Sequence, residues 1–428
     1  MRFLHLISAL CSASLAAAWT TYVVPHSPGN DDTPALAAAL AANKSLLTDA
    51  TILFQKGITY NISTPISFPK LQNVVVSIEG NITYAADIKK TQAIVKSSSF
   101  PGHWFTFSGT NVTLAGSQDP NWGWVNANGQ KWWDAMQKVS SRVNRPHGWA
   151  FKGVTNGEIV NMKLWQPVAW SFSVSGSDNV HIHNNTIIAV SYSSSSPSNT
   201  DAFDAGGTNL LFENNVVYNG DDCLAVGSPA SNIVFRNSYC NGGHGLSVGS
   251  LGKGGAVADV QNILRIRFTG QGSRVGPEVK ELLKSTIIEC LLDISDRIPL
   301  FSITWSNITL KKVKLPIYVT QHYWDQNVGK EPTNSSYQTS TSIDTITFQN
   351  FQGTIDDSKG NGVTGSTGKE VVVFDLFQGT AKSLLAKTIS TTTVSGSNVM
   401  VMCDPSTVSN DVGFKCWDGL YEPTAAGA

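Results

Sequence analysis

The sequence predicts an all-β protein, a parallel β-helix in which short strands coil around a shared core. Asn156, Asn179, Asn209 and Asn232 each open a short run of alternating apolar residues, and they follow one another after 23, 30 and 23 residues. A repeat of roughly 20 to 30 residues built from strands is typical of a solenoid. Gly, Ser, Thr and Asn outweigh Lys and Glu among the polar residues, which also favours strands and turns.

A helical repeat is excluded because no 3.6-residue apolar stripe runs through these Asn- and Gly-rich segments. The 428 residues would make two or three domains of roughly 150 residues each. A repetitive β architecture grows as one unit, however, so we expect a single domain over residues 19–428. Lys and Arg number 30 against 31 Asp and Glu, so the chain has no basic patch typical of nucleic-acid binding.

The two ends of the solenoid need covers, because open strand edges invite aggregation. An Ala- and Leu-rich run from Thr33 to about Leu47 predicts a short capping helix, with Thr33 as its N-cap and Pro34 at the first helical position. We expect the Ser- and Thr-rich tail around residues 403–416 to cover the other end.

The N-terminus predicts secretion. Arg2 precedes an apolar run that ends in small residues at 16–18, so residues 1–18 read as a signal peptide. No later stretch reaches about 18 apolar residues, so we expect no membrane span. Seven glycosylation sequons agree with an extracellular protein, at Asn43, Asn61, Asn81, Asn111, Asn184, Asn307 and Asn334.

Five cysteines remain after removal of the signal peptide. In an oxidising compartment the short pairs Cys223–Cys240 and Cys403–Cys416 are the natural disulfides, which leaves Cys290 over.

Three short motifs share the period of the coil: Asn-Thr-Asp at 199–201, Gly-Asp-Asp at 220–222 and Gly-His-Gly at 243–245. Asp201 and Asp222 are 21 residues apart, and Asp222 and His244 are 22 apart. Residues one turn apart lie on adjacent rungs, about 4.8 Å from each other, so we expect Asp201, Asp221, Asp222 and His244 to form one column.

Crowded carboxylates perturb each other's ionisation, which suits acid and base catalysis. An inverting glycosidase uses one carboxylic acid and one carboxylate about 6.5–9.5 Å apart, a spacing that neighbouring rungs supply. Each motif alone is more often a turn or a solvated loop. Their common register favours a catalytic site.

These motifs resemble those of the fungal polygalacturonases of glycoside hydrolase family 28, and the resemblance runs from about residue 31 to the C-terminus. It implies a right-handed parallel β-helix that inverts the anomeric configuration and needs no metal or other cofactor. By this resemblance Asp221 is the general acid, Asp201 and Asp222 hold and activate water, and His244 tunes the protons and contacts the substrate. Asn199, Gln321 and Tyr323 are the corresponding substrate-binding residues.

The fourth family motif, Arg-Ile-Lys, is missing from the expected window around residues 278–280. The most similar residues are Arg265 and Arg267, about ten residues before that window. We take these two arginines as the candidates for binding the substrate carboxylate. The coil pattern also breaks over residues 264–301, where residues 281–292 read as a helix. We hypothesise an error in the gene model there, and a real insertion is the alternative.

The sequence therefore predicts a secreted, monomeric exo-polygalacturonase that acts on pectic substrates. Ala202, in place of the usual Gly, resembles the exo-acting branch of the family. An α-L-rhamnosidase or exo-rhamnogalacturonase of the same fold is one alternative, and a non-catalytic β-helix that binds cell-wall polysaccharide is another. Several tryptophans between residues 104 and 170 could stack on sugars, although packing inside the protein is their commoner role.

Overall fold

The computed structural model describes residues 19–137, 144–249, 251, 260–268, 290–291, 298–322, 341–379 and 381–428. The expected signal peptide over 1–18, Tyr323 and Asn334 lie outside these residues, as does most of the segment 264–301. Arg265 and Arg267 are described by their backbone only.

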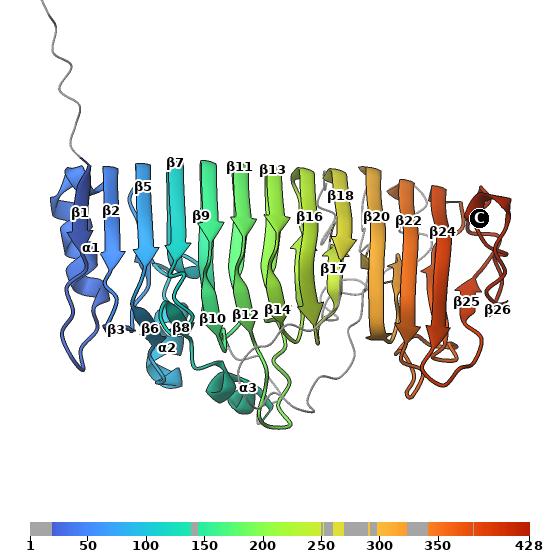
Figure 1. Ribbon diagram of the computed structural model, residues 1–428, viewed down its shortest axis with the longest axis horizontal. Coiled ribbons are helices and arrows are strands. Elements are labelled where there is room, and N and C mark those ends of the chain that lie inside the picture. Colours follow the sequence, from blue (N-terminus) through green and yellow to red (C-terminus); the bar gives the residue numbers. More distant parts are fainter. Residues whose placement is uncertain are drawn as a thin grey trace, which may run out of the picture.

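The chain forms a parallel β-helix, as predicted, with its long strands stacked side by side along one axis (Figure 1). Every pairing between named strands is parallel except that of β25 with β26. The longest ladder runs through β1 (Thr20–Val23), β2 (Thr48–Phe54), β5 (Leu71–Ile78), β7 (His103–Gly116), β9 (His147–Val160), β11 (Phe172–His183), β13 (Phe203–Glu213), β16 (Ala230–Asn241), β18 (Val260–Phe268), β20 (Ile298–Val313), β22 (Thr341–Ile355) and β24 (Ala381–Thr393).

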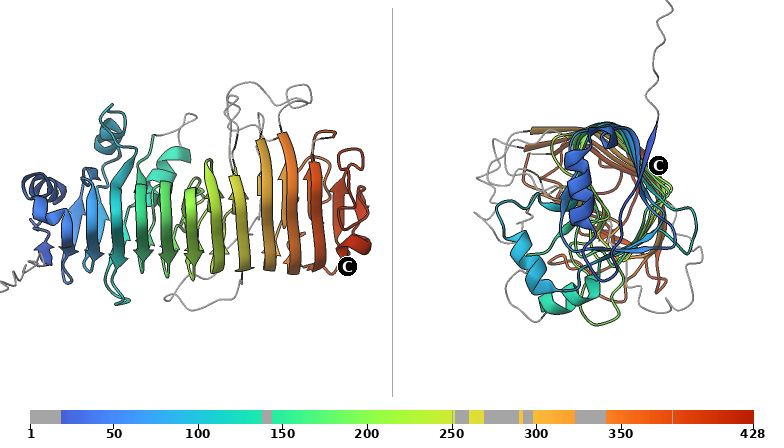
Figure 2. Two further views of the ribbon diagram at one scale, coloured as in Figure 1. Left: turned by 90° about the horizontal axis from the view of Figure 1, so that it is seen from above. Right: turned by 90° about the vertical axis from the view of Figure 1, so that its left-hand side faces the viewer.

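Shorter strands complete each turn of the coil, and the end-on view in Figure 2 shows them enclosing the core. One set pairs in succession and ends on the last residues of β16: β3 (Thr59–Ile62), β6 (Asn81–Tyr84), β8 (Trp124–Asn126), β10 (Lys163–Trp165), β12 (Thr186–Ile188) and β14 (Val216–Tyr218). The remaining strands are β4 (Ile66–Ser67), which pairs with β7, then β15 (Asp222–Val226), β17 (Gly245–Val248), β19 (Cys290–Leu291), β21 (Ile317–Thr320), β23 (Glu370–Asp375), β25 (Met400–Cys403) and β26 (Gly419–Leu420).

The repeated asparagines turn the corners of the coil, as predicted. Asn156, Asn179, Asn209 and Asn232 have φ angles of 54°, 57°, 56° and 55°, in the left-handed region that Asn tolerates well. Their side chains also bridge rungs: Asn179 Nδ2 donates to Asn156 Oδ1 at 2.7 Å, and Asn232 Nδ2 donates to Asn209 Oδ1 at 3.0 Å.

The core is a continuous stack of apolar side chains inside the coil. Phe105 and Trp149 stack with their ring centroids 4.0 Å apart on adjacent rungs. Trp132 and Trp133 are also buried, so packing is the role of these tryptophans, whereas Trp124 and Trp165 are half-buried.

A helix covers the N-terminal end, as predicted, but its bounds differ from the expectation. Helix α1 spans Thr33–Ala42 and its N-cap is Asp32 rather than Thr33. The helix ends early because the side chain of Asn43 accepts from Ser45 N and begins the 3₁₀ turn η1 (Lys44–Leu46). Two further helices, α2 (Ile88–Val95) and α3 (Gly129–Gln137), lie outside the coil (Figure 1).

The tail packs at the C-terminal end of the coil and finishes in the turn η4 (Ala425–Gly427). Both predicted disulfides, Cys223–Cys240 and Cys403–Cys416, are present. No helix among the described residues is long and apolar enough to cross a membrane.

The coil continues at both ends of the segment 264–301, where the sequence predicted an interruption of the coil pattern. Residues 264–268 continue strand β18, and residues 298–301 begin strand β20. Cys290 and Leu291 form a strand that pairs with β21, so the helix expected over 281–292 is wrong at these two residues. Residues 281–289 and 292 lie outside the described part of the chain.

Candidate active site

Three adjacent rungs carry the predicted column of acidic residues, and each residue lies at the start of a strand. Asp201 precedes β13, Asp221 immediately precedes β15, Asp222 begins β15, and His244 immediately precedes β17. The ladder aligns Phe203 with Leu224, and Asp222 with Gly245. The structure therefore brings the four sequence-predicted residues together, because their spacing matches one turn of the coil.

The carboxylate of Asp221 is held on three sides. Its Oδ2 accepts from the backbone N–H of Asn199 at 2.7 Å, and its Oδ1 accepts from the backbone N–H of Asp222 at 3.0 Å. Nδ1 of His244 lies 3.1 Å from the same Oδ1. Asp222 is fixed as well, because its Oδ1 accepts from the Ser247 hydroxyl on the next rung.

Glycine at position 243 allows this close packing. A β-carbon there would collide with the backbone oxygen of Asp221 and with Oδ1 of Asn219. Nδ2 of Asn219 in turn donates to the backbone oxygens of Thr200 and Asp222 at 3.1 and 2.8 Å. The glycine and the buried asparagine thus tie the three motifs into one unit.

A fourth carboxylate, Asp204, belongs to the same site, and the sequence reasoning missed it. Asp204 follows the inward-pointing Phe203 on β13, so the alternation of a strand places it on the outer face. It lies close enough to Asp201 for its charge to raise the pKa of that residue. Burial raises the pKa of Asp204 well above its ordinary value, and the charges of Asp222 and Asp221 add to the effect.

Asp201 has a similar environment. Burial raises its pKa well above the ordinary value, and the charges of Asp204, Asp221 and Asp222 raise it further. Among the described residues no partner hydrogen-bonds Oδ1 of Asp201 or Oδ2 of Asp204. These buried oxygens therefore favour the protonated form or a bound polar ligand.

Asp221 differs from its neighbours. Burial opposes its ionisation, but the hydrogen bond and charge of His244 and the two backbone N–H groups outweigh burial and lower its pKa. The site thus holds carboxyl groups whose pKa values are pushed in opposite directions: the raised pKa of Asp201 and Asp204 favours their protonated form, and the lowered pKa of Asp221 favours its ionised form.

A second set of polar and aromatic groups adjoins the carboxylates on the N-terminal side. Arg145 donates to Oδ1 of Asn199 at 2.9 Å and to the backbone oxygens of Ser198 and Val168 at 2.8 and 3.2 Å. The rings of His147 and Trp170 lie 4.2 Å apart, and a small apolar hollow lined in part by Trp170 opens beside them.

Two histidines in this region are neutral over most of the acidic range. Burial lowers the pKa of His103 to about 3, and the charges of His147 and Lys152 contribute. Burial and the charge of Arg145 lower the pKa of His147 to about 4. Among the described residues, Lys152 and Arg145 are the cations whose charges act on these two histidines.

The other predicted substrate-binding residues differ in their exposure. Asn199 is exposed and supports Asp221, which agrees with a place beside the substrate. Gln321 has no exposed surface, and its Oε1 accepts from the backbone N–H of Phe377 at 2.7 Å. This burial is at odds with the expectation that Gln321 touches the sugar.

The backbone register is also at odds with the expectation that Arg265 and Arg267 bind the substrate beside the carboxylates. The ladder aligns Arg265 with Phe235, which aligns with Phe212 near the end of β13. The carboxylates lie at the opposite end of that strand. Arg265, which resembles the arginine of the family motif, is therefore part of an ordinary strand of the coil.

Asp221, Asp222 and His244 each place one ligand atom within 4.8 Å of the other two, so these residues could hold a cation. Their oxygen and imidazole donors suit a divalent metal. The same three groups carry the hydrogen bonds described above, which a metal would have to replace.

The model of Glycosyl hydrolases family 28 matches residues 48–403. A protein from Neosartorya fischeri named probable exopolygalacturonase C is 33% identical over 419 residues, which cover 92% of this chain and 89% of that protein. A protein of the same name from Aspergillus terreus is 36% identical over 357 residues, which cover 82% of this chain and 78% of that protein. Among solved structures, endo-xylogalacturonan hydrolase from Aspergillus tubingensis superposes with a TM-score of 0.75 and 22% identity, over 94% of this chain and 99% of that one, a likeness of fold alone.

Proposed function

The chain belongs to glycosyl hydrolases family 28, and we propose that it is a secreted exo-polygalacturonase that releases galacturonate from chain ends with inversion. The observation that carries this proposal is the cluster of Asp201, Asp204, Asp221 and Asp222 with His244 on three adjacent rungs. Relatives named exopolygalacturonase over most of the chain support the polygalacturonate substrate.

In the proposed reaction Asp221 protonates the glycosidic oxygen as the bond to the anomeric carbon breaks. Because the pKa of Asp221 is lowered in the site without substrate, we assign storage of this proton to His244, whose Nδ1 lies 3.1 Å from Oδ1 of Asp221 and passes the proton to the acid as the substrate binds. Water held by Asp201 and Asp222 attacks from the opposite face and gives up a proton to the ionised carboxylate. Asp204 opposes ionisation of Asp201 and so sets the pH above which this base works.

The uronate carboxylate needs a cation, and we assign this role to Arg145. Arg145 contacts Asn199, whose backbone holds Asp221, so a carboxylate bound there lies beside the acid. Guanidinium groups bind carboxylates strongly through paired hydrogen bonds. Arg145 then takes the place of the missing Arg-Ile-Lys motif.

A rhamnose-releasing enzyme is the second candidate. The register that places Arg265 at the opposite end of the strands from the carboxylates favours this candidate, because a neutral terminal sugar needs no pair of basic residues. Hydrolysis of an aryl α-L-rhamnoside, with no galacturonate released from polygalacturonate, would select this candidate.

We further propose removal of residues 1–18, a monomer in solution, and a single domain over residues 19–428. Glycans are expected at the exposed Asn43, Asn111 and Asn307, whereas the side-chain amide of the exposed Asn184 already contacts His183. Asn61 and Asn81 are half-buried within strands, which makes them poorer acceptors. Peptide mapping of the secreted protein tests these proposals, and peptides from residues 269–289 would disprove a gene-model error there.

The decisive variant is Asp221→Asn. Removing the general acid should lower kcat on polygalacturonate by about 10²- to 10⁴-fold while oligogalacturonide binding persists. Asp178→Asn is the matched control, because this exposed aspartate lies on an outer corner, where it accepts from Asn209. Undiminished hydrolysis by Asp221→Asn would overturn the proposed role, and binding without hydrolysis by the wild type would favour a non-catalytic binding protein.

A further inference from the structure

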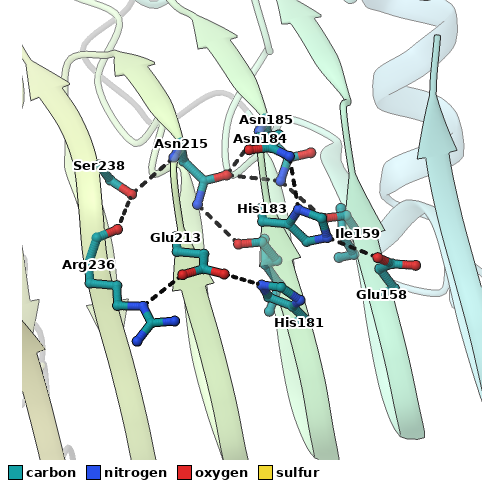
Figure 3. Close-up of polar contacts among 11 residues, drawn as sticks. Glu158, Ile159, His181, His183, Asn184, Asn185, Glu213, Asn215, Arg236 and Ser238 are labelled. Atoms are coloured by element: carbon teal, nitrogen blue, oxygen red, sulfur yellow. Dashed lines mark hydrogen bonds and ion pairs between the residues drawn. The ribbon is translucent and has the colours of Figure 1, made fainter. Parts of the chain in front are cut away.

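A second cluster of imidazole and carboxylate groups lies on neighbouring long strands of the coil (Figure 3). His181 and His183 are two residues apart on β11, so the alternation of the strand points both rings to the same face. Glu158 on the preceding rung, β9, lies opposite His181 in the ladder. Glu213 on the following rung, β13, lies opposite His183.

These side chains already contact one another. His183 Nε2 lies 2.9 Å from Glu158 Oε1, and His181 Nε2 lies 2.9 Å from Glu213 Oε1. The two rings stack with their centroids 3.9 Å apart and their planes 23° apart. One ligand atom from each of Glu158, His181 and His183 lies within 4.8 Å of the other two.

The backbone beneath the cluster is held by buried amides. Asn185 Nδ2 donates to Asn215 Oδ1 at 3.0 Å and to the backbone oxygen of Ile159 at 3.2 Å. Asn215 Nδ2 donates to the backbone oxygen of Ile182 at 3.1 Å. Because Ile159 and Ile182 adjoin the ligating residues, these bonds hold Glu158, His181 and His183 on fixed rungs, as Figure 3 shows.

We propose that Glu158, His181 and His183 form a binding site for a divalent transition ion such as Zn²⁺. Two imidazoles and one carboxylate are a usual protein ligand set for zinc, leaving a position for water. Small side-chain rotations bring donors 4.8 Å apart or closer onto one ion. The ion links rungs β9 and β11 and stabilises this wall of the coil.

The hydrogen bonds of the empty site fit this role, because each ring now presents Nε2 to a carboxylate. Metal binding through Nε2 moves each ring proton to Nδ1. For His183 a partner is already in place: its Nδ1 lies 3.1 Å from the side-chain amide of Asn184, whose oxygen accepts that proton after the amide turns over. Glu213 is less available to the ion, because it also pairs with Arg236 at 2.7 Å.

The site is separate from the catalytic cluster. Asp204 and Glu213 lie on the same strand, nine residues apart, and the strand bends at Asn209 between them. The ion therefore contributes to stability and not to glycoside cleavage. Hydrolysis by the full-length protein should be the same with and without zinc bound at this site.

Isothermal titration of the chelator-treated, deglycosylated protein with Zn²⁺ at neutral pH tests the proposal. The wild type should bind zinc with saturation, and its melting temperature should rise. His181→Gln, His183→Gln and Glu158→Gln should each lose this binding event while retaining the zinc-free melting temperature and the wild-type kcat. His244→Gln is the control, because it removes the only other described cluster of this kind and should keep this binding event.

Absence of saturable zinc binding by the wild type would overturn the proposal. Binding that survives His183→Gln but disappears in His244→Gln would also overturn it, because the ion would then lie at the catalytic cluster. If one of the glutamine variants has a changed melting temperature without zinc, its fold is disturbed, and the zinc binding of the other two variants then tests the proposal.

Discussion

His244 Nδ1 lies 3.1 Å from Oδ1 of Asp221, one rung away, and this pair distinguishes Asp221 from the other carboxylates of the site. Burial raises the pKa of Asp201 and of Asp204 well above the ordinary value, and the neighbouring carboxylates raise both further. The pKa of Asp221 falls because His244 and two backbone N–H groups stabilise its charge. In the proposed mechanism the proton for the glycosidic oxygen therefore belongs to the Asp221–His244 pair as a whole.

Replacing Asp204 should move the pH profile of the enzyme. The charge of Asp204 raises the pKa of Asp201, so Asp204→Asn lowers that pKa. The base works when ionised, and the acid limb of the kcat profile should therefore move to lower pH. Rates measured across the acidic range check this, with Asp178→Asn as the control. A limb that stays in place or moves up would contradict the role of Asp201 as base.

Replacing Arg145 should weaken recognition of the substrate carboxylate. Arg145→Gln removes a charge-assisted contact, and KM for trigalacturonate should rise roughly ten- to a hundredfold. The methyl-esterified trisaccharide should be little affected, and Arg145→Lys should restore part of the affinity. Lys415→Gln is the control, because Lys415 pairs with Glu422 in the tail. An equal loss on both substrates would mean that Arg145 acts by holding the Ser198 and Val168 carbonyls instead.

A methyl group at position 243 should disturb the site and the fold together. Gly243→Ala forces a clash with the backbone of Asp221, so we expect a loss of about 1–3 kcal/mol in the free energy of unfolding and a lower kcat. Gly227→Ala is the matched control, since nothing lies within 4 Å of a β-carbon there. Urea unfolding and kinetics of both variants measure the effect. If Gly243→Ala kept the wild-type free energy of unfolding and kcat, the Gly-His-Gly motif would pack too loosely for a methyl group to clash.

Stability should decline as the solution becomes acidic. His103 and His147 have pKa values of about 3 and about 4 in the folded chain, against an ordinary value of 6.5. Between pH 6.5 and pH 4 the unfolded chain binds more protons than the folded chain, so their contribution is complete above pH 6.5 and is lost on acidification. The double variant His103→Gln, His147→Gln should flatten this dependence in thermal melts. An unchanged slope would show that other groups cause it.

The sequence predicted the rungs well because one physical requirement recurs at each corner. Asparagine in the left-handed region marks every turn from Asn156 to Asn232, and the catalytic motifs keep that period. Asp204 could have been found by the same rule, since it follows an inward-pointing Phe203 on a strand. The corner at Asn262, 30 residues after Asn232, likewise shows that Arg265 belongs to a coil strand.

Other features depend on contacts that spacing does not encode. The pKa of Asp221 is lowered first by His244 and then by the backbone N–H groups of Asn199 and Asp222, and sequence patterns carry no information on the direction of those N–H groups. Gln321 is buried because its carbonyl accepts from Phe377, 56 residues away. The capping helix ended early for a local reason, the turn begun by the Asn43 side chain.

Chromatography of the earliest products from polygalacturonate tests the central claim most directly. The secreted protein, incubated briefly with excess polymer, should release galacturonate monomer as its sole early product, and Asp221→Asn should release none. A ladder of oligogalacturonides from the first time points would contradict exo action. Absence of any galacturonate product from the wild type would contradict the proposed substrate.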